Sequence, residues 1–215
     1  MAFEGWPAEA LEFYEGLAAD NSKSYWASHK AVYDEQVLRP MTELLAELAP
    51  AFGETKIFRP YRNLRFSKDK TPYKTQLGAM TGTGYIQLSA AGLAVGDGMY
   101  HMAPDQLDRY RRAVASELPG GELERIAAAL ADQGIGTGGY EVLKTAPRGY
   151  PADHPRIGLL RYKGLIAWKE WPAGPWLGTQ EAKERITSVL SATRPLSAWL
   201  TTHVGPSTEP ARRGR

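Results

Sequence analysis

The sequence contains no cysteine, which excludes disulfide bonds, thiolate catalysis and cysteine-ligated zinc or iron–sulfur sites. Long hydrophobic runs are also missing: apolar stretches such as residues 90–95 are far shorter than the about 20 residues that a membrane-spanning helix needs. Residues 1–7 carry neither a basic region nor an apolar core, so we expect no secretory signal. These absences are compatible with a reducing cytoplasm, and we expect a cytoplasmic protein without a membrane partner.

The composition is typical of a globular protein. Hydrophobic residues make up 43% and charged residues 23% of the 215 positions, which excludes general disorder, a collagen and a coiled coil. This length suits one domain, and the sequence has no internal repeat. Residues 205–215 lack large apolar side chains, so we expect a single domain over residues 1–204, followed by a mobile C-terminal tail over residues 205–215.

Charge is distributed unevenly, although the net charge is only +2. Residues 1–55 contain three bases and ten acids, which give −7. Residues 56–74 contain seven bases and one acid, which give +6, and residues 75–215 contain 16 bases and 13 acids, which give +3. Such a local excess of positive charge indicates either an anionic partner or an internal network of ion pairs with the acidic N-terminal region.

Helical periodicity dominates the first 50 residues of the sequence. Residues 7–19 place apolar side chains at the i, i+3, i+4 and i+7 positions of a helix. The Asp-Asn-Ser sequence at residues 20–22 ends this helix and caps a second one. Pro40 is expected to end or kink the second helix, because proline lacks an N–H donor and clashes with the preceding turn. A third helical stretch reaches Pro50.

From residue 56 to residue 100 glycine and threonine become frequent, and short strands replace the helical pattern. The predicted strands, separated by turns at residues 81–84 and 90–92, are residues 56–59, 64–66, 76–80, 85–89 and 93–100. The later elements are helices from residue 104, residue 121, residue 153 and after residue 179, with an edge strand over 141–144 and a strand over 165–171. This order predicts an α+β fold, with a mostly antiparallel sheet flanked by N-terminal and C-terminal helices.

The strongest candidate for a binding site is the basic segment, residues 56–74. Its bases recur every two to four residues with aromatic residues between them. Arginine offers a planar fork to the oxygens of a phosphate or carboxylate, lysine offers a movable point charge, and the hydroxyl and N–H groups of a tight loop complete such a site. The segment lacks the glycines of a Walker loop. The predicted ligand-binding residues of this segment are Arg62, Arg65, Ser67, Lys68, Lys70, Tyr73 and Lys74.

Residues 65–74, which read Arg-Phe-Ser-Lys-Asp-Lys-Thr-Pro-Tyr-Lys, resemble the signature of a bacterial and fungal family called domain of unknown function 2461. Residues 13–33 and 149–163 are similar to further parts of that family, and the resemblance extends from residue 3 to residue 202. At Asn63 the sequence departs from the more acidic residue that the family leads us to expect, so we assign no carboxylate role there. The resemblance implies a single α+β domain, and it implies no mechanism because the family has no settled activity.

Two further bases, Arg161 and Lys163, follow an Asp153-His154 pair. We expect Arg161 and Lys163 to join the basic segment around one anion if the fold brings the two regions together. An aspartate that orients a histidine can form a general base. Adjacent residues rarely face each other, however, so Asp153 is expected to cap a helix, with His154 exposed beside it.

No motif assigns a reaction to the sequence. The four histidines show neither i, i+4 nor His-x-His spacing, so we expect no metal site, and no cofactor is indicated. A Gly-x-Ser-x-Gly nucleophile motif is absent. Ser67 and Lys70 have the Ser-x-x-Lys spacing, but Pro72 disfavours the helix that this arrangement needs. The sequence therefore does not decide whether the protein is an enzyme.

Three interpretations of the basic segment remain open at this point. It binds a small phosphate- or carboxylate-bearing ligand, it binds nucleic acid although no known reader motif is present, or it pairs structurally with the acidic N-terminal helices. The first predicts a concave cluster of unpaired Arg and Lys, and the second predicts a steep loss of affinity with added salt. The third predicts a carboxylate within salt-bridge reach of each base. The sequence specifies neither a partner protein nor an oligomeric state.

Overall fold

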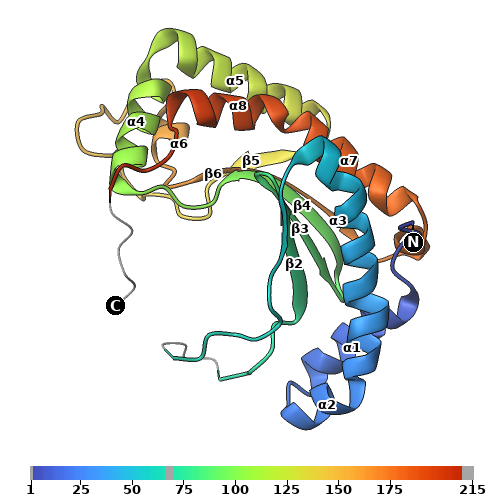
Figure 1. Ribbon diagram of the computed structural model, residues 1–215. Helices are drawn as coiled ribbons and strands as arrows, with labels where there is room; N and C mark the ends of the chain where they lie inside the picture. Colours follow the sequence, from blue (N-terminus) through green and yellow to red (C-terminus); the bar gives the residue numbers. More distant parts are fainter. Residues whose placement is uncertain (1, 66–69, 210–215) are drawn as a thin grey trace. The chain divides into compact units, whose positions relative to one another are not determined.

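The structure, a computed structural model, describes residues 2–65 and 70–209 (Figure 1). The strands of this described part form one sheet in the order β1-β2-β3-β4-β6-β5. They are β1 (Thr55–Ile57), β2 (Gln76–Thr81), β3 (Gly84–Ser89), β4 (Gly92–Met99), β5 (Gly136–Gly138) and β6 (Leu165–Pro172). The pairs β1–β2, β2–β3 and β5–β6 are antiparallel, and helices precede and follow the strands along the chain. The predicted α+β fold is therefore confirmed.

The chain divides into two compact units. Unit 1 consists of Met1–Val95 and Glu170–Leu190, and unit 2 consists of Gly96–Lys169 and Ser191–Arg215. Strands β4 and β6 contribute residues to both units. Compactness does not decide whether such units fold independently, so the single domain over residues 1–204 stays a prediction.

The helices of unit 1 follow the predicted periodicity. They are α1 (Ala8–Ala19), α2 (Lys23–Val32), α3 (Arg39–Phe52) and most of α7 (Glu181–Ala192). The apolar face of α1 is buried, as its i, i+3, i+4, i+7 spacing requires. Ser22 caps α2, because its hydroxyl oxygen accepts a hydrogen bond from the Tyr25 N–H (3.1 Å). Both the first helix and the cap of the second agree with the sequence analysis.

Pro40 does not end the second helix. Helix α2 passes through a π-helical turn, Tyr33–Leu38, directly into α3, and Pro40 lies in the first turn of α3. In a regular α-helix the proline ring clashes with the carbonyl group four residues earlier, and a π turn widens the helix at that point. The irregularity predicted at Pro40 is therefore a widened turn within a continuing helix.

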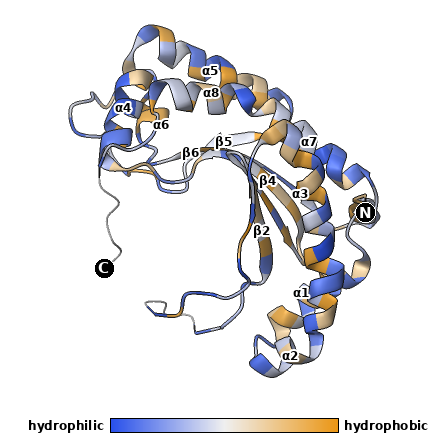
Figure 2. Ribbon diagram, viewed as in Figure 1, coloured by the Kyte–Doolittle hydropathy of each residue, from blue (hydrophilic) through white to orange (hydrophobic). Residues whose placement is uncertain are grey.

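The sheet of unit 1 has one buried face and one half-exposed face. In the β2–β3 register Leu77 pairs with Leu88 and Ala79 pairs with Ile86, and all four side chains are buried. Helix α3 contacts β1 and β2, and the apolar bands on α3 and β2 are visible in Figure 2. Because neighbouring residues of a strand alternate between faces, the opposite side, which we call the open face, carries Lys56, Gln76, Met80, Tyr85 and Gln87.

Two strand predictions in the basic segment need correction. Strand β1 ends at Ile57, two residues before its predicted end. Residues 64 and 65 form a turn instead of the strand predicted over 64–66, whose last residue lies outside the described part of the chain. The Asn63 side chain accepts a hydrogen bond from the Arg65 N–H (3.3 Å), and such an Asx turn bends the backbone away from an extended path.

Unit 2 contains α4 (Pro104–Ala115), α5 (Glu117–Asp132), the short α6 (Ile157–Leu160) and α8 (Arg194–His203). Helix α5 begins before the predicted start at residue 121. Pro119 lies in its first turn, where a missing N–H leaves no helical hydrogen bond unmade. Helix α6 covers only part of the helix predicted over residues 153–162. Helix α4 begins at Pro104 as predicted, whereas the bounds predicted for α5 and α6 differ from those observed.

The edge strand predicted over residues 141–144 is wrong. That segment makes one isolated bridge, between Val142 and Tyr162, and the edge strand is β5 in the glycine-rich connection before it. Close backbone approach explains the difference, because a Cβ atom at Gly139 would lie 2.8 Å from the Gly164 carbonyl oxygen. The missing side chain at Gly139 is what allows the chain to come this close to the start of β6.

The residues that follow α8 are bonded to α4. The Arg109 side chain donates hydrogen bonds to the carbonyl oxygens of Val204 (2.5 Å) and Pro206 (2.7 Å). The Asp105 carboxylate accepts hydrogen bonds from the Ser207 hydroxyl (2.7 Å) and the Thr208 N–H (2.8 Å). The start of the predicted tail is therefore attached to unit 2, and the mobility of residues 205–215 stays a prediction.

Candidate functional site

The basic segment forms a long connection between β1 and β2 that leaves the sheet (Figure 1). Its two arms are joined by an isolated antiparallel bridge between Tyr61 and Tyr73. The backbone N–H groups of Arg62 and Lys74 donate hydrogen bonds to prolyl carbonyl oxygens of the opposite arm, at 2.9 and 2.8 Å. Because proline keeps its carbonyl acceptor, prolines in both arms are compatible with this bridge. We call the described residues 58–65 and 70–75 the basic hairpin.

Asn21 fixes the basic hairpin to the start of α2. Its side-chain N–H donates to the Tyr73 carbonyl oxygen (3.1 Å), and its side-chain oxygen accepts from the Tyr73 N–H (3.0 Å). The Asn21 amide thus satisfies both backbone groups of Tyr73, as a neighbouring strand would. The predicted capping region at residues 20–22 therefore has a second role, which is to hold the hairpin.

Trp26 provides the apolar anchor of the hairpin. Its indole stacks on the Tyr73 ring at a centroid distance of 4.4 Å and an interplanar angle of 7°, and only 6% of Trp26 is exposed. Trp26 also contacts the rings of Phe13, Tyr33 and Tyr61. Tyr73 itself is 5% exposed, and its burial raises the pKa of its phenol. Tyr73 was predicted as a ligand-binding residue; its environment gives it an anchoring contact with Trp26, and its role in ligand binding stays a prediction.

Two lysines of unit 1 lie beside the open face of the sheet, and Arg59 is close enough to one of them to affect its pKa. The Lys56 and Lys74 ammonium groups lie 5.6 and 5.7 Å from the centroid of the Phe58 ring, within the range of cation–π attraction. Partial burial, and then repulsion from the Arg59 guanidinium, lowers the pKa of Lys74. Among the described residues no carboxylate pairs with Lys56, Arg59 or Lys74. We call these three residues the cationic cluster.

Neutral polar groups of the open face lie next to the cationic cluster. The Tyr85 and Phe58 ring centroids are 6.1 Å apart. Tyr85 lies across Gly78, where a Cβ atom would be 2.5 Å from the phenol oxygen, and burial raises the pKa of Tyr85. The Gln76 side-chain N–H donates to the Gln87 side-chain oxygen (2.8 Å). The open face thus combines positive charge with amide and phenol groups that can hydrogen-bond to a ligand.

The predicted ligand-binding residues have different environments. Arg62, Arg65 and Lys70 lie on the basic hairpin, and the Lys70 ammonium donates to the Leu64 carbonyl oxygen (3.2 Å). The predictions for Ser67 and Lys68 fall outside the described residues. The sequence analysis did not select Lys56, Phe58 or Arg59 as site residues. A signal was present, because alternation along the strand predicted over residues 56–59 places Lys56 and Phe58 on one side.

Arg161 and Lys163 belong to unit 2, where each already has a local partner. The Arg161 Nε–H donates to the Leu143 carbonyl oxygen (2.5 Å). The Lys163 ammonium pairs with the Glu141 carboxylate (2.8 Å), and this hydrogen bond lowers the pKa of Glu141. The predicted convergence of these two bases with the basic segment around one anion stays a prediction.

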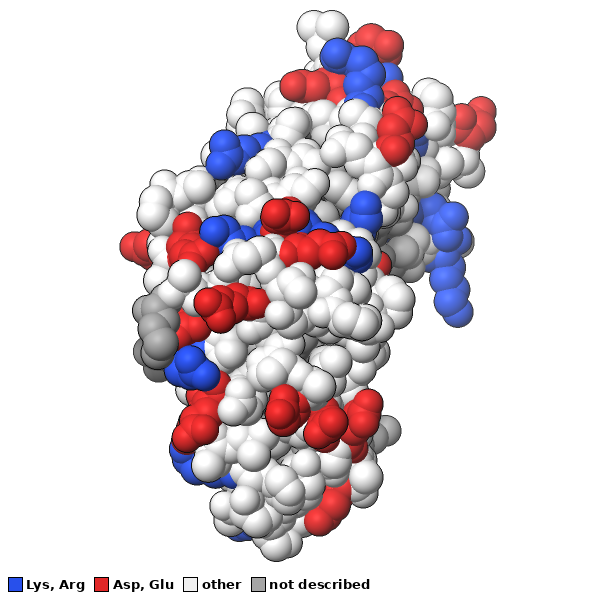
Figure 3. Space-filling model, turned by 90° about the vertical axis from the view of Figure 1, so that its right-hand side faces the viewer, with Lys and Arg blue, Asp and Glu red and all other residues white. Residues whose placement is uncertain are grey.

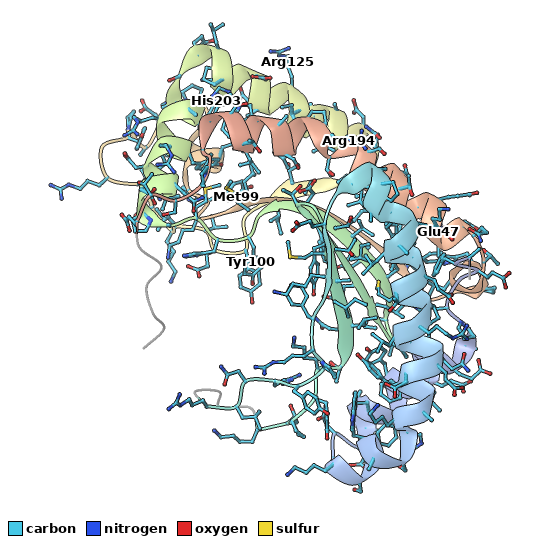
Figure 4. All side chains as sticks on the ribbon, viewed as in Figure 1. Glu47, Met99, Tyr100, Arg125, Arg194 and His203 are labelled. Atoms are coloured by element: carbon cyan, nitrogen blue, oxygen red, sulfur yellow. The ribbon has the colours of Figure 1, made fainter. Side chains whose placement is uncertain are left out.

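Three acids of the N-terminal region, Asp34, Glu43 and Glu47, pair with residues outside the basic segment. Lys30 pairs with Asp34 on the same helix, and Arg39 pairs with Glu43 (3.6 Å). Glu47, labelled on α3 in Figure 4, accepts from Lys183 of α7 (2.6 Å) and from the Phe3 N–H (2.8 Å), and both bonds lower its pKa. Acidic and basic side chains are interspersed on the face shown in Figure 3. The purely structural interpretation therefore has no support from Lys56, Arg59 or Lys74.

Asp153 and His154 do not form the general base considered above. The N-terminal cap of α6 is Arg156, so the expected capping role of Asp153 is wrong. The Arg156 N–H donates to His154 Nδ1 (3.0 Å), and the Arg156 side chain pairs with Glu124 (2.8 Å). His154 thus uses a ring nitrogen to hold the turn before α6, which is a structural role.

Within residues 2–65 and 70–209, no group of three or more His, Asp and Glu side chains is arranged to hold a metal ion. None of the helices in the same residues is both long and apolar enough to cross a membrane. The candidate site consists of cations, amides and aromatic rings, which are groups that can attract and hydrogen-bond to negative charge.

Comparison with known proteins gives one match, to a family model. No curated protein and no solved structure matches the chain. One family model matches residues 9–199, and its description is conserved hypothetical protein (DUF2461). This match confirms the resemblance seen in residues 65–74 and covers most of the chain. The chain belongs to the DUF2461 family of conserved hypothetical proteins.

Proposed function

We propose that the protein binds a small anion with several negative charges, of the phosphate or carboxylate class, at the cationic cluster of unit 1. The observation that carries this proposal is the position of Lys56 and Lys74 at the Phe58 ring, with Arg59 close enough to lower the pKa of Lys74 and no carboxylate partner for the three among the described residues. Like charges at such a site repel one another, and an anion between them replaces repulsion with attraction.

The surroundings of the cluster support a small ligand. Gln76, Gln87 and Tyr85 offer hydrogen-bonding groups on the open face. The predicted ligand-binding residues Arg62, Arg65 and Lys70 would add contacts from the hairpin. Three clustered cations suit a diphosphate or a tricarboxylate, whereas nucleic-acid binding proteins commonly contact about 6–10 phosphates. A cytoplasmic location, expected from the cysteine-free sequence, would supply such anions and stays a prediction.

Isothermal titration calorimetry with pyrophosphate and with citrate tests the proposal. Variants Lys56→Ala and Lys74→Ala should each weaken binding about tenfold or more, because a hydrogen bond to a charged group is lost. Lys23→Ala is the matched control, since Lys23 is an exposed lysine of the same unit without an ion pair in the described structure. Its affinity should equal that of the unaltered protein.

Two results would contradict the proposal. One is the absence of binding of either anion at millimolar concentration, and the other is equal binding by Lys74→Ala and the Lys23→Ala control. A third titration, with a single-stranded oligothymidylate, addresses nucleic acid. Oligothymidylate binding that is tight, falls steeply with salt and requires Lys56 and Lys74 would replace the small-anion proposal with a nucleic-acid function.

A further inference from the structure

Unit 2 carries a pair of tyrosines that face water. Among the described residues the exposed large apolar side chains are Tyr61, Tyr100, Leu118, Tyr140 and Val142. Tyr100 and Tyr140 are 58% and 72% exposed, and their ring centroids are 4.8 Å apart at an angle of 33°. Figure 4 shows the Tyr100 side chain projecting from the backbone that follows β4. Each ring therefore contacts the other while most of both side chains stays in water.

The backbone holds this tyrosine pair in place. The Lys163 N–H donates to the Glu141 carbonyl oxygen (2.9 Å), and the Met102 N–H donates to the Lys163 carbonyl oxygen (3.1 Å). A Cβ atom at Gly164 would lie 2.3 Å from the Tyr100 carbonyl oxygen, so the segments that carry the two tyrosines are held against a third segment. Aromatic rings on such support lose little conformational entropy when a ligand binds.

The carboxylate and the ammonium group beside the tyrosine pair are paired with each other. The Glu141 carboxylate pairs with the Lys163 ammonium (2.8 Å), and His101 is exposed next to Tyr100. The Arg161 Nε–H donates a hydrogen bond to the Leu143 carbonyl oxygen. A surface that stacks nucleic-acid bases combines aromatic rings with cations left free for phosphates, and this surface has an ion pair instead.

We propose that Tyr100 and Tyr140 form a binding site for a neutral oligosaccharide. The C–H faces of a pyranose ring are apolar and pack against aromatic rings, and the ring hydroxyls can donate to Glu141 and accept from Lys163. Tyr100, Tyr140 and Val142 are too few for a stable protein interface, which buries about 800 Å² on each partner. A neutral ligand with an apolar face and a polar edge fits both the exposed rings and the Glu141–Lys163 ion pair beside them.

Titration of the full chain with cellohexaose, chitohexaose and maltohexaose tests this site by calorimetry. We expect at least one hexasaccharide to bind, and Tyr140→Ala should weaken that binding about tenfold. Tyr140→Phe keeps the ring and should retain most of the affinity. Leu118→Ala is the control, because Leu118 is an exposed apolar residue of the same unit and should not affect binding.

The proposal is overturned if none of the three sugars binds, or if Tyr140→Ala binds a sugar as tightly as Leu118→Ala does. It is also overturned if an oligothymidylate, and no sugar, loses affinity in Tyr140→Ala. Pyrophosphate binding should be the same in Tyr140→Ala and in the unaltered protein. The outcome at the tyrosine pair is thus separate from the outcome at the cationic cluster.

Discussion

The cationic cluster of unit 1 and the tyrosine pair of unit 2 both place lysine beside aromatic rings, yet they balance charge in opposite ways. Lys56 and Lys74 flank Phe58 with no carboxylate partner in the described structure, whereas Lys163 is held by Glu141 at 2.8 Å. The first arrangement favours an anion, and the second favours a neutral ligand. Aromatic and basic composition alone therefore does not indicate the charge of a ligand. The charge of a suitable ligand depends on whether each ammonium group already has a carboxylate partner.

Substitution of Trp26 should have the largest effect on stability, because it removes the anchor of the basic hairpin. It should leave the tyrosine pair of unit 2 unchanged. Trp26→Ala deletes a buried indole stacked on Tyr73, and such changes cost about 3–5 kcal/mol of unfolding free energy. Urea denaturation followed by circular dichroism measures the loss. In the fraction that remains folded, pyrophosphate binding should be weakened and hexasaccharide binding unchanged.

Trp176→Ala is the matched control for that experiment. Trp176 is a half-buried tryptophan of unit 1 whose ring lies 4.1 Å from the Arg185 guanidinium carbon, away from the hairpin contacts. Its removal should cost less stability and leave pyrophosphate binding intact. A cost for Trp26→Ala equal to that of Trp176→Ala would contradict the anchoring role of Trp26.

Asn21 gives the next largest expected effect. In Asn21→Ala both backbone groups of Tyr73 lose their partner, and leaving such groups unpaired costs about 1–3 kcal/mol. Hydrogen exchange of the Tyr73 amide should accelerate, and pyrophosphate should bind more weakly because the hairpin is less ordered. Asn21→Asp keeps the acceptor and loses the donor, so its effect should be intermediate. Unchanged exchange at Tyr73 in Asn21→Ala would show that the Trp26 stacking alone holds the hairpin.

The elements that could be predicted from the sequence are those with local causes. The buried face of α1 follows from residue spacing, and the Ser22 cap follows from its side chain. The π turn before Pro40 and the edge strand β5 could not be predicted. The first depends on how a continuing helix adapts to a proline ring. The second depends on a close approach between Gly139 and Gly164, which are distant in sequence.

The candidate site was predicted in part, for a related reason. The excess of bases in residues 56–74 was visible in the sequence, and so was the alternation that pairs Lys56 with Phe58. The burial of Tyr73 could not be foreseen, because it depends on the contacts with Asn21 and Trp26, about 50 residues earlier. The sequence thus indicated the cluster of basic residues, but it did not indicate that Tyr73 is buried against Trp26.

Two charge substitutions should exchange the properties of the two surfaces. Lys56→Glu supplies a carboxylate to the cationic cluster, so pyrophosphate binding should fall about tenfold or more. Glu141→Gln removes the partner of Lys163 and leaves an uncompensated ammonium beside the tyrosine pair. That variant should gain weak, salt-sensitive binding of oligothymidylate, measured by fluorescence anisotropy in low and high salt. If Lys56→Glu binds pyrophosphate normally, charge balance is not what distinguishes the surfaces.

The smallest expected effect concerns how stability and anion binding depend on pH through the ionisation of Lys74. Partial burial and Arg59 lower its folded-state pKa below the ordinary value of about 10.4, so the folded protein releases this proton at a lower pH than the unfolded chain does. Unliganded protein should therefore gain a little stability as the pH rises through the lowered pKa of Lys74, because the unfolded chain then binds more protons.

Ligand binding should show the opposite trend at the same residue. Citrate keeps its three carboxylates ionised across this range, and its affinity should fall as Lys74 loses its charge. In Lys74→Arg the fall should move to higher pH, because a guanidinium keeps its charge beyond about pH 12. Calorimetric titrations across the alkaline range compare the two proteins. Superimposable profiles would mean that the Lys74 ammonium does not contact the anion, and the cationic cluster would then reduce to Lys56 and Arg59.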